Sequence, residues 1–423
     1  MIEINPIKKL KAEVLILGSK YIANRLLIIC ALAEGISILK NFPKNEDTDN
    51  AIKALKNFGI EIKHKENKLI IKGTGGKITS AKKDINVGDS GTLFRFITSF
   101  AALANGKTKI TGSNRIKERP ISELLNSLAK LGIKVKSNHG FAPILIEGGT
   151  FKGGVTKINS KTSSQFISSL LLAAPFAEKD VEMVVEGDLV SKAYVDLTID
   201  LMKKFGVSAE RRGYKKFRVR SGQKYKSREF KIPADFTSAN YFLAAAAIVP
   251  GIVRIKGLDI KSKQPESRFV EVLKRMGCLV KRKNGVIKLK GPPKLKAINI
   301  DMSSMPDSVQ TLAVIAAFAD GNTRIRSISH LKHKESDRIQ DTANELRKLN
   351  VNVKIEQNQF VIKKSNLIPS VIDPHNDHRM AMSFALFGLK ISGIKIKNPE
   401  CVNKSFPQFW ETLKKIGAGI KNV

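Results

Sequence analysis

Cationic side chains in this sequence fall where helices are expected to begin. Lys20, Arg338 and Arg379 lie in predicted first turns, and Arg25 and Arg95 follow shortly after. A cation in a first turn opposes the helix dipole, so its presence at several such turns needs another reason. Backbone N–H groups, the dipole and a cation can together hold an anion. The pattern therefore predicts a substrate, or a pair of substrates, with more than one phosphate or carboxylate group.

The expected helix starts recur at an almost constant interval. Successive starts lie 72 residues apart four times and then 70, at Ser19, Gly91, Ser163, Asp235, Asp307 and Asp377. At Asp235 and Ser238, simple capping of the first turn explains the residues as well as ligand binding does. The stretches that follow the starts are strongly apolar, which predicts helices buried at the centre of their units.

A second, amphipathic helix is expected later in each unit. These helices end at residues that favour a left-handed backbone, namely Gly59, Gly132, Gly206, Gly277, Asn350 and Gly417. Alternating segments follow the first five ends, for example 60–63 with 68–72, and predict β-hairpins. Each unit of about 72 residues thus reads as strand, helix, strand, helix and hairpin.

The repeat predicts an α/β fold of two lobes, each built from three βαβαββ units. One unit cannot cover its own buried helix, so several must pack with parallel helices inside and sheets outside, as an inside-out α/β barrel. Three units fit into residues 19–234, which we expect to form one lobe. Residues 1–18 with 235–423 are expected to form the other, discontinuous lobe.

The chain is strongly basic. Its 423 residues include 74 Lys and Arg and 38 Asp and Glu, a formal net charge of 74 − 38 = +36, and 42% are hydrophobic. That apolar content excludes a disordered chain. The charge favours nucleic acid, an anionic membrane or an anionic substrate without choosing among them. A basic stretch at 211–220 is the best candidate for nucleic-acid binding, but Phe217 and Val219 alternate with Arg218 as in a half-buried strand.

Cysteines and apolar runs bear on the cellular compartment. Cys30, Cys278 and Cys401 lie far apart and outside any CxxC pattern, which predicts neither a disulfide framework nor a zinc site. The longest apolar run, at 26–33, is too short to cross a bilayer. We therefore expect a cytoplasmic protein, a monomer, with no membrane or nucleic-acid partner.

Short motifs along the chain follow a known order. They lie at 18–25, 90–95, 117–120, 163–166, 187–192, 306–307, 334–338, 376–382 and 404–407, and include Gly18-Ser19-Lys20 and Asp377-His378-Arg379. In this order, and over nearly the full length, they resemble the enolpyruvyl transferase family, in particular its members that act on shikimate 3-phosphate. The family fold of two lobes, each of three βαβαββ units, agrees with the repeat.

The resemblance implies a reaction without metal or organic cofactor. Phosphoenolpyruvate and shikimate 3-phosphate give an enolpyruvyl ether and phosphate, on the way to chorismate and the aromatic amino acids. The shikimate 5-hydroxyl must lose a proton and C3 of phosphoenolpyruvate must gain one, which needs an acid, a base and a cage of cations. By resemblance, Asp307 is the base toward the hydroxyl. Glu335 exchanges the proton at C3, with Lys20 or Lys404 assisting.

The same likeness assigns binding residues, with the 19–234 lobe on the shikimate 3-phosphate side and the discontinuous lobe on the phosphoenolpyruvate side. Shikimate 3-phosphate would contact Lys20, Tyr21, Arg25, Ser163, Ser164, Gln165, Ser191, Tyr194, Asp307, His330 and Lys334. Phosphoenolpyruvate would contact Lys20, Asp89, Gly91, Arg119, Gln165, Arg338, His378, Arg379 and Lys404.

Some positions depart from the family pattern. Tyr21 replaces a small hydroxylic residue, and Asp89 and His330 stand where Asn is frequent. Gly91 is retained, which makes glyphosate an expected inhibitor.

Three alternatives remain open. A sister enzyme that transfers enolpyruvyl to a UDP-sugar would carry a reactive cysteine near 115–120, where none occurs. A nucleic-acid-binding protein would cluster its cations beside exposed aromatic residues, but only 6% of residues are aromatic. A degenerate relative that binds shikimate 3-phosphate poorly is the third, motivated by Leu17 and Tyr21.

Overall fold

The computed structural model describes residues 1–66, 68–259 and 261–423, which form a mixed α/β fold. These residues divide into two compact units. The continuous unit comprises Gly18–Ile232, and the discontinuous unit comprises Met1–Leu17 with Pro233–Val423. Each unit has a hydrophobic core of its own, so each is described by itself.

The strands of the continuous unit are arranged in four-stranded sheets. The strands are β3 (Glu34–Lys40), β4 (Glu61–Lys65), β5 (Lys68–Thr74), β6 (Ile85–Asn86), β7 (Gly106–Thr111), β8 (Lys134–Asn138), β9 (Phe141–Gly148), β10 (Gly154–Asn159), β11 (Val181–Glu186), β12 (Ala209–Arg212), β13 (Lys216–Val219) and β14 (Glu229–Lys231). Within the described part of this unit they form three sheets, β14-β3-β5-β4, β6-β7-β9-β8 and β10-β11-β13-β12. In each, the first pair is parallel and the others are antiparallel.

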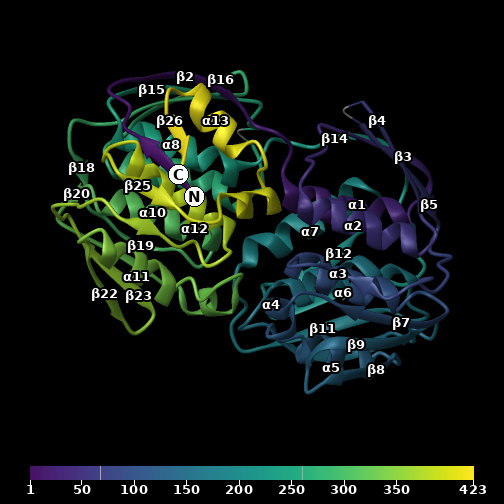
Figure 1. The fold of residues 1–423 in the computed structure, drawn as a ribbon. Coiled ribbons are helices and arrows are strands. Elements are labelled where there is room, and N and C mark those ends of the chain that lie inside the picture. Colours follow the sequence, from purple (N-terminus) through teal and green to yellow (C-terminus); the bar gives the residue numbers. More distant parts are fainter. Residues whose placement is uncertain (67, 260) are drawn as a thin grey trace. The chain divides into compact units, whose positions relative to one another are not determined.

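Buried helices occupy the middle of this unit (Figure 1). Helices α1 (Lys20–Leu32), α3 (Gly91–Ala101) and α6 (Gln165–Ala173) contact one another. All of α1 is buried, as its apolar sequence predicts. Helices α2 (Glu46–Asn57), α5 (Ser122–Lys130) and α7 (Lys192–Lys204) bury one face only, and α4 (Asn114–Lys117) is a single turn.

The discontinuous unit follows the same plan. Its sheet strands are β1 (Ile2–Asn5), β2 (Leu10–Leu15), β15 (Gly251–Lys256), β16 (Leu279–Lys283), β17 (Val286–Lys290), β19 (Asn299–Asp301), β21 (Asn322–Arg326), β22 (Asn352–Glu356), β23 (Gln359–Lys363), β24 (Val371–Ile372), β25 (Ile394–Ile396) and β26 (Gly419–Asn422). Their orders are β16-β17-β15-β2, β19-β21-β23-β22 and β24-β25-β1-β26, and short β18 (Leu295–Lys296) pairs with β20 (Ala319–Asp320).

Helices α8 (Phe236–Ile248), α10 (Val309–Ala316) and α12 (His378–Gly388) are the buried helices of this unit. They contact one another, while α9 (Phe269–Arg275), α11 (Gln340–Lys348) and α13 (Phe409–Lys415) are amphipathic. Short 3-10 helices η3 (Pro306–Ser308), η4 (Ser329–His333) and η5 (Pro399–Lys404) carry several of the predicted site residues.

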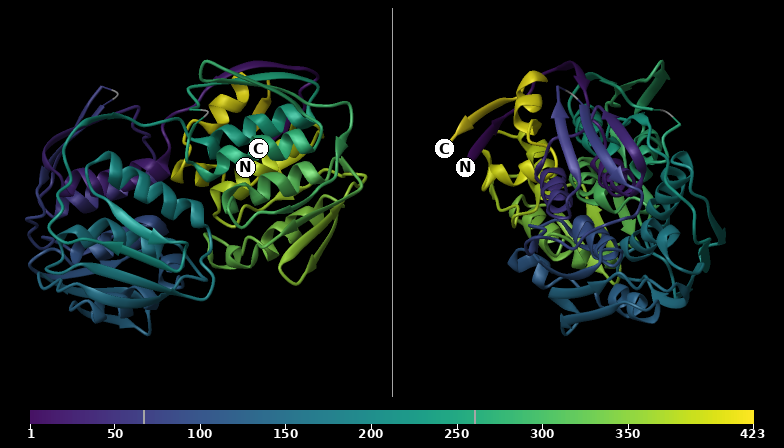
Figure 2. Two further views of the ribbon diagram at one scale, coloured as in Figure 1. Left: turned by 180° about the vertical axis from the view of Figure 1, so that it is seen from behind. Right: turned by 90° about the vertical axis from the view of Figure 1, so that its right-hand side faces the viewer.

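The two chain ends complete one sheet together. Strand β1 pairs antiparallel with both β25 and β26, so that Glu3 lies opposite Lys395 and Lys421. The ends lie side by side in both views of Figure 2. The last repeat lacks the second strand of its hairpin, and β1 from the N-terminus takes that place beside β26.

The left-handed helix ends are confirmed. Residues Gly59, Gly132, Gly206, Gly277, Asn350 and Gly417 all have φ between 60° and 109°. The predicted hairpins are also present, for example β4 with β5 and β16 with β17. The basic stretch at 211–220 contains strand β13, in which Phe217 and Val219 are buried, while Arg218 and Lys216 pair outside with Asp180 and Glu182.

Two helices begin two residues after the predicted start, α6 at Gln165 rather than Ser163 and α10 at Val309 rather than Asp307. Asp307 lies in the 3-10 turn η3, and α10 starts only at Val309. Pro306 is the first residue of that turn, a position that suits proline because the N–H it lacks has no helical partner there. Asp307 is thereby set ahead of the helix.

Candidate functional site

Lys20 lies at the N-terminus of the buried helix α1 in the continuous unit. Ser19 is the N-cap, and Lys20 is the first helical residue. Its Nζ lies 2.9 Å from Asp47 Oδ2, and both side chains are at least nine-tenths buried. Asp47 lies in the first turn of α2, where the helix dipole favours a carboxylate. The ion pair holds the Lys20 ammonium close to the start of α1.

Tyr21 and Tyr194 contact each other next to this ion pair. Their ring centroids are 5.1 Å apart, and Lys20 Nζ lies 5.7 Å from the Tyr21 centroid. Arg25 binds both tyrosines through their backbone, because Nη1 donates to Tyr21 O at 2.9 Å and Nη2 to Tyr194 O at 3.1 Å. Its Nε donates to Thr198 Oγ1 at 2.7 Å. Arg25 therefore connects the backbone of α1 with that of α7 beside the two rings.

A second group forms at the start of α3. Gly91 is its first residue, and an added Cβ there would lie 2.4 Å from the Arg119 guanidinium carbon. Arg119 is buried, and Asp89 accepts a hydrogen bond from Ser113, which caps α4. Only glycine leaves the Arg119 guanidinium its present place against α3.

Gln165 connects α6 with this group. Its Nε2 donates to Thr92 Oγ1 at 3.0 Å, and Ser163 Oγ accepts from the Gln165 backbone at 3.2 Å. Ser164 caps α6. Within the described residues Gln165 Oε1 is buried without a hydrogen-bond partner, which is costly unless a ligand or water fills the role.

Ser191 is the N-cap residue of α7 and has a left-handed backbone conformation, with φ of 52°. Its carbonyl accepts from Tyr194 N at 3.0 Å. Non-glycine residues rarely adopt this conformation, and those that do cluster at functional sites.

Arg338 is the centre of the cluster in the discontinuous unit. Its side chain is 1% exposed. Nε lies 2.7 Å from Asp377 Oδ2, Nη1 2.7 Å from Asp307 Oδ1 and Nη2 2.9 Å from Glu335 Oε2. Burial alone would lower the pKa of Arg338, but these carboxylates raise it well above its usual value.

Arg379 and Lys404 complete the cluster. Arg379 Nε lies 3.2 Å from Asp307 Oδ1, and Nη1 donates to Tyr241 OH at 3.1 Å. Burial raises the pKa of Tyr241 to about 12, although Arg379 acts in the opposite direction. Lys404 Nζ lies 3.8 Å from Glu335 Oε1. Asp307 and Glu335 are therefore each contacted by two cations.

His378 and His330 are buried beside these groups. His378 Nδ1 lies 3.7 Å from Asp377 Oδ1. Burial, reinforced by Lys334, lowers the pKa of His330 from 6.5 to about 3, so His330 is neutral at physiological pH. In the part of the chain that the structure describes, His330 Nε2 is buried without a hydrogen-bond partner.

The predicted site residues thus gather within each unit. In the continuous unit, one contact group contains Lys20, Tyr21, Arg25, Ser191 and Tyr194. A second, at the starts of α3 and α6, contains Asp89, Gly91, Arg119, Ser163, Ser164 and Gln165, and the two groups together are called the continuous-unit cluster. The discontinuous-unit cluster contains Asp307, His330, Lys334, Glu335, Arg338, His378, Arg379 and Lys404.

Sequence reasoning missed Asp47 and Tyr241, and it used Asp377 as a helix start and part of a motif but not as a partner of Arg338. Asp47 had one usable signal, its place in an acidic first turn. Tyr241 had none, because it lies in an apolar stretch of α8, 138 residues from Arg379.

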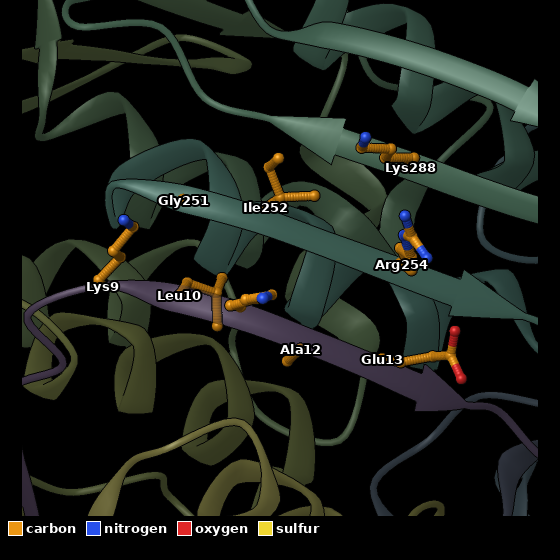
Figure 3. Close-up of a pocket in the computed structure, with 9 residues that line it drawn as sticks. Lys9, Leu10, Ala12, Glu13, Gly251, Ile252, Arg254 and Lys288 are labelled. Atoms are coloured by element: carbon orange, nitrogen blue, oxygen red, sulfur yellow. The ribbon is translucent and has the colours of Figure 1, made fainter.

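A cavity of about 380 Å³ lies away from these residues. It lies over strands β2, β15 and β17, and Figure 3 shows Lys9, Arg254 and Lys288 around it. None of the predicted site residues lines it. Among the described residues no helix is long and apolar enough to span a membrane, and no trio of His, Cys, Asp or Glu is arranged to hold a metal ion.

Comparisons with known proteins identify the family. Residues 4–413 match the family model of EPSP synthase (3-phosphoshikimate 1-carboxyvinyltransferase). A 3-phosphoshikimate 1-carboxyvinyltransferase of Methanoculleus marisnigri is 40% identical over 398 residues, 93% of this chain and 94% of its own. The enzyme of that name from Nostoc punctiforme is 40% identical over 403 residues, 94% of this chain and 95% of its own.

Solved structures give the same result. The EPSP synthase of Acinetobacter baumannii superimposes with a TM-score of 0.84 at 26% identity, covering 100% of this chain and 99% of the other. The mixed α/β fold is therefore that of EPSP synthase structures. The match of the family model over almost the whole length, with relatives of about 40% identity, leads to one conclusion: the chain belongs to the EPSP synthase family.

Proposed function

We propose that the two clusters hold the substrates of this enzyme and carry its proton transfers. The enzyme transfers the enolpyruvyl group of phosphoenolpyruvate to the 5-hydroxyl of shikimate 3-phosphate and releases phosphate, a step of the shikimate pathway to the aromatic amino acids. The assignment of individual residues below is our proposal.

The residues that bind shikimate 3-phosphate lie chiefly in the continuous unit, namely Lys20, Tyr21, Arg25, Ser163, Ser164, Gln165, Ser191 and Tyr194. The proposed set also includes Asp307, His330 and Lys334. Lys20 supports this because its ammonium lies at a helix N-terminus, where N–H groups and the dipole also favour a phosphate. The buried, unpartnered Oε1 of Gln165 and Nε2 of His330, noted for the described residues, are polar atoms that a hydroxylated ligand would satisfy.

Phosphoenolpyruvate is bound by Arg119, Arg338, Arg379 and Lys404, with Lys20, Asp89, Gly91, Gln165 and His378 beside them. Guanidinium groups suit its phosphate and carboxylate because they donate parallel hydrogen bonds to both. We also expect glyphosate, an anion of similar groups, to compete for these cations. Gly91 keeps space for the Arg119 guanidinium.

Asp307 is the base toward the 5-hydroxyl. Two guanidinium groups, of Arg338 and Arg379, contact its carboxylate, which accepts the proton. As the hydroxyl proton moves to Asp307, the hydroxyl oxygen bonds to C2 of phosphoenolpyruvate. Glu335 gives a proton to C3 in the same addition, which leaves a tetrahedral intermediate.

Elimination reverses the proton transfer at C3. Glu335 takes a proton back from C3, the C2–O bond to phosphate breaks, and the double bond reforms. Lys404, 3.8 Å from Glu335, is placed to offset the charge that changes on this carboxyl, and Lys20 is the assisting cation in the other unit. The phosphate leaves with the electron pair of the C2–O bond and takes up the proton that Asp307 holds, so both carboxyl groups return to their starting states.

The finer points of architecture and setting are part of the proposal. In each unit the buried helices run parallel inside the sheets, as an inside-out α/β barrel. The discontinuous unit is the phosphoenolpyruvate side. Cys30, Cys278 and Cys401 are free, which suits a reducing cytoplasm. We expect a monomer that binds neither nucleic acid nor membrane and uses no metal or organic cofactor.

The observation that carries the proposal is the joint contact of Asp307 and Glu335 with Arg338. The test is a phosphate-release assay with phosphoenolpyruvate and shikimate 3-phosphate, each alone and together, with the product identified by mass spectrometry. Release only with both substrates, with an enolpyruvyl ether of shikimate 3-phosphate formed, is the expected result. Release with a UDP-sugar in place of shikimate 3-phosphate would favour the sister activity and overturn the proposal.

A further inference from the structure

The loop between β24 and α12 holds an unusual backbone. His375 has φ of 50° and Asn376 φ of 55°, so two successive residues other than glycine are left-handed. This conformation costs free energy and persists only where contacts fix it. The next residue, Asp377, is the buried carboxylate that binds Arg338 and caps α12 through Arg379 N at 2.9 Å. A displacement of this loop would therefore also move Asp377 and change its contacts with Arg338 and Arg379.

Contacts with α11 fix the first of these residues. His375 Nε2 lies 3.1 Å from Glu345 Oε1, and His375 Nδ1 lies 4.0 Å from Asp341 Oδ1. Asp341 and Glu345 are four residues apart on α11 and so share one face. Each ring nitrogen of His375 thus faces a carboxylate, and the imidazole lies across one turn of that helix.

Glu345 is itself held from several directions. Its side chain is 1% exposed. Oε2 accepts from Asp373 N at 3.0 Å, and Lys348 Nζ lies 2.7 Å from Oε1. Lys397 lies 3.6 Å from the carboxylate of Asp373. A buried carboxylate with these donors is a rigid anchor for the loop.

The second left-handed residue connects the loop to η5. Asn376 Oδ1 accepts from Asn398 Nδ2 at 3.1 Å, and Asn398 immediately precedes η5, whose last residue is Lys404. The loop thus has contacts with α11, continues into α12 and reaches η5. Helix α11 begins two residues after Arg338, helix α12 contains Arg379, and η5 ends at Lys404.

We infer that His375 is a positioning residue: its imidazole, held by Glu345 and Asp341, fixes the loop that sets Arg338, Arg379 and Lys404 at their mutual distances. This inference rests on the proposed function, because it matters for catalysis only if these cations bind phosphoenolpyruvate. His375 itself does not touch the reacting groups in this account.

The test substitutes His375→Gly in the full chain. Glycine accepts the left-handed backbone without cost, so the variant removes the imidazole and leaves the turn allowed. The matched control is His139→Gly, because His139 is also left-handed, with φ of 50°, and lies in an exposed turn of the other unit. Glu345→Gln is the second variant, since it keeps the shape of the anchor and removes its charge.

We expect His375→Gly to raise KM for phosphoenolpyruvate about tenfold, the effect of losing one hydrogen bond to a charged group. KM for shikimate 3-phosphate should stay near the wild-type value. Glu345→Gln should move KM in the same direction, and His139→Gly should change neither KM. An unchanged KM for phosphoenolpyruvate in His375→Gly, or an equal rise for both substrates, would overturn the inference.

Amide hydrogen exchange separates this inference from the proposed function. Exchange in peptides covering 376–380 should become about tenfold faster in His375→Gly and stay unchanged in His139→Gly, whether or not the enzyme turns over. If the wild type released no phosphate with both substrates, the proposed function would fail while faster exchange would still support the loop's anchoring by His375. Unchanged exchange in His375→Gly would overturn the inference independently of activity.

Discussion

The cations of the two clusters have different partners. In the continuous unit, Arg25 donates to carbonyl and hydroxyl oxygens, and Lys20 lies against one carboxylate, that of Asp47. In the discontinuous unit, Arg338 contacts the carboxylates of Asp307, Glu335 and Asp377. An anion entering the second cluster must therefore compete with carboxylates, and two of those are the proposed acid and base. Under the proposed function, this difference means that one cluster receives an anion and the other couples its arrival to proton transfer.

Removal of the base should have the largest effect. We expect Asp307→Asn to lower kcat by roughly 10²- to 10⁴-fold, the usual contribution of a general base, while the enzyme still binds shikimate 3-phosphate. Single-turnover kinetics together with calorimetric titration of the sugar phosphate measures both quantities. A variant with wild-type kcat would show that Asp307 serves only as a counter-ion of Arg338 and Arg379.

The charge balance around Arg338 should also matter for stability. Asp377→Asn keeps a good helix cap but leaves Arg338 buried with one carboxylate fewer, which should cost about 3–5 kcal/mol of unfolding free energy. Urea denaturation of wild type and variant measures this loss.

The matched control is Asp180→Asn, which breaks the exposed ion pair with Arg218 and should change stability far less. Equal losses in the two variants would mean that the Arg338 cluster gains nothing from its burial.

Much of this comparison could be predicted from local sequence, and part of it could not. Ser19 and Asp377 mark helix starts, and Gly59 or Asn350 mark helix ends, because capping and left-handed positions depend on a few neighbouring residues. The partner of Lys20 lies 27 residues away. Contacts at that separation depend on how the elements pack, so local patterns do not reveal them.

The same limit explains the other differences. The repeat places residues 1–18 with residues 235–423, but no local pattern indicates that β1 pairs with β25 and β26. The turn η3 delays α10 by two residues relative to the repeat, since Pro306 starts a 3-10 turn. The cations of both clusters were found because their residue types conflict with the helix dipole, a local signal.

His330 offers a pH test of the discontinuous-unit cluster. Its pKa is about 3 in the folded protein and 6.5 in the unfolded chain, so the unfolded state gains a proton that the folded state does not. Its contribution to stability is therefore complete above pH 6.5 and is lost as the pH falls toward 3. Between pH 7.5 and 5 the wild type should lose about 2 kcal/mol more unfolding free energy than His330→Asn does. Parallel losses in both proteins would show that His330 takes up its proton in the folded state.

Gly91→Ala tests the steric fit between the start of α3 and Arg119 in the continuous unit. The new Cβ would lie 2.4 Å from the Arg119 guanidinium carbon, so the guanidinium must move. We expect KM for phosphoenolpyruvate to rise about tenfold, because a charged hydrogen bond is lost or misplaced. Shikimate 3-phosphate affinity should change little. If KM for phosphoenolpyruvate is unaltered in steady-state assays, Arg119 does not bind that substrate.

Tyr21 should give the smallest effect. If its hydroxyl binds shikimate 3-phosphate, Tyr21→Phe should weaken binding by about 0.5–1.5 kcal/mol and leave the contact with the Tyr194 ring intact. If the ring obstructs the ligand instead, Tyr21→Ser should improve affinity. Calorimetric titration of both variants decides between these outcomes, and unchanged affinity in both would place the Tyr21 side chain away from the ligand.

Calorimetric titration of shikimate 3-phosphate alone, into Lys20→Met and Arg379→Met, tests the division between the two clusters most directly. The account predicts that Lys20→Met weakens binding roughly tenfold to a hundredfold, because it removes a charged partner of the phosphate at the start of α1. Arg379→Met should bind this ligand as the wild type does, and its defect should appear in KM for phosphoenolpyruvate and, because Arg379 lies beside Asp307, in kcat. Equal loss of shikimate 3-phosphate affinity in both variants would contradict the account.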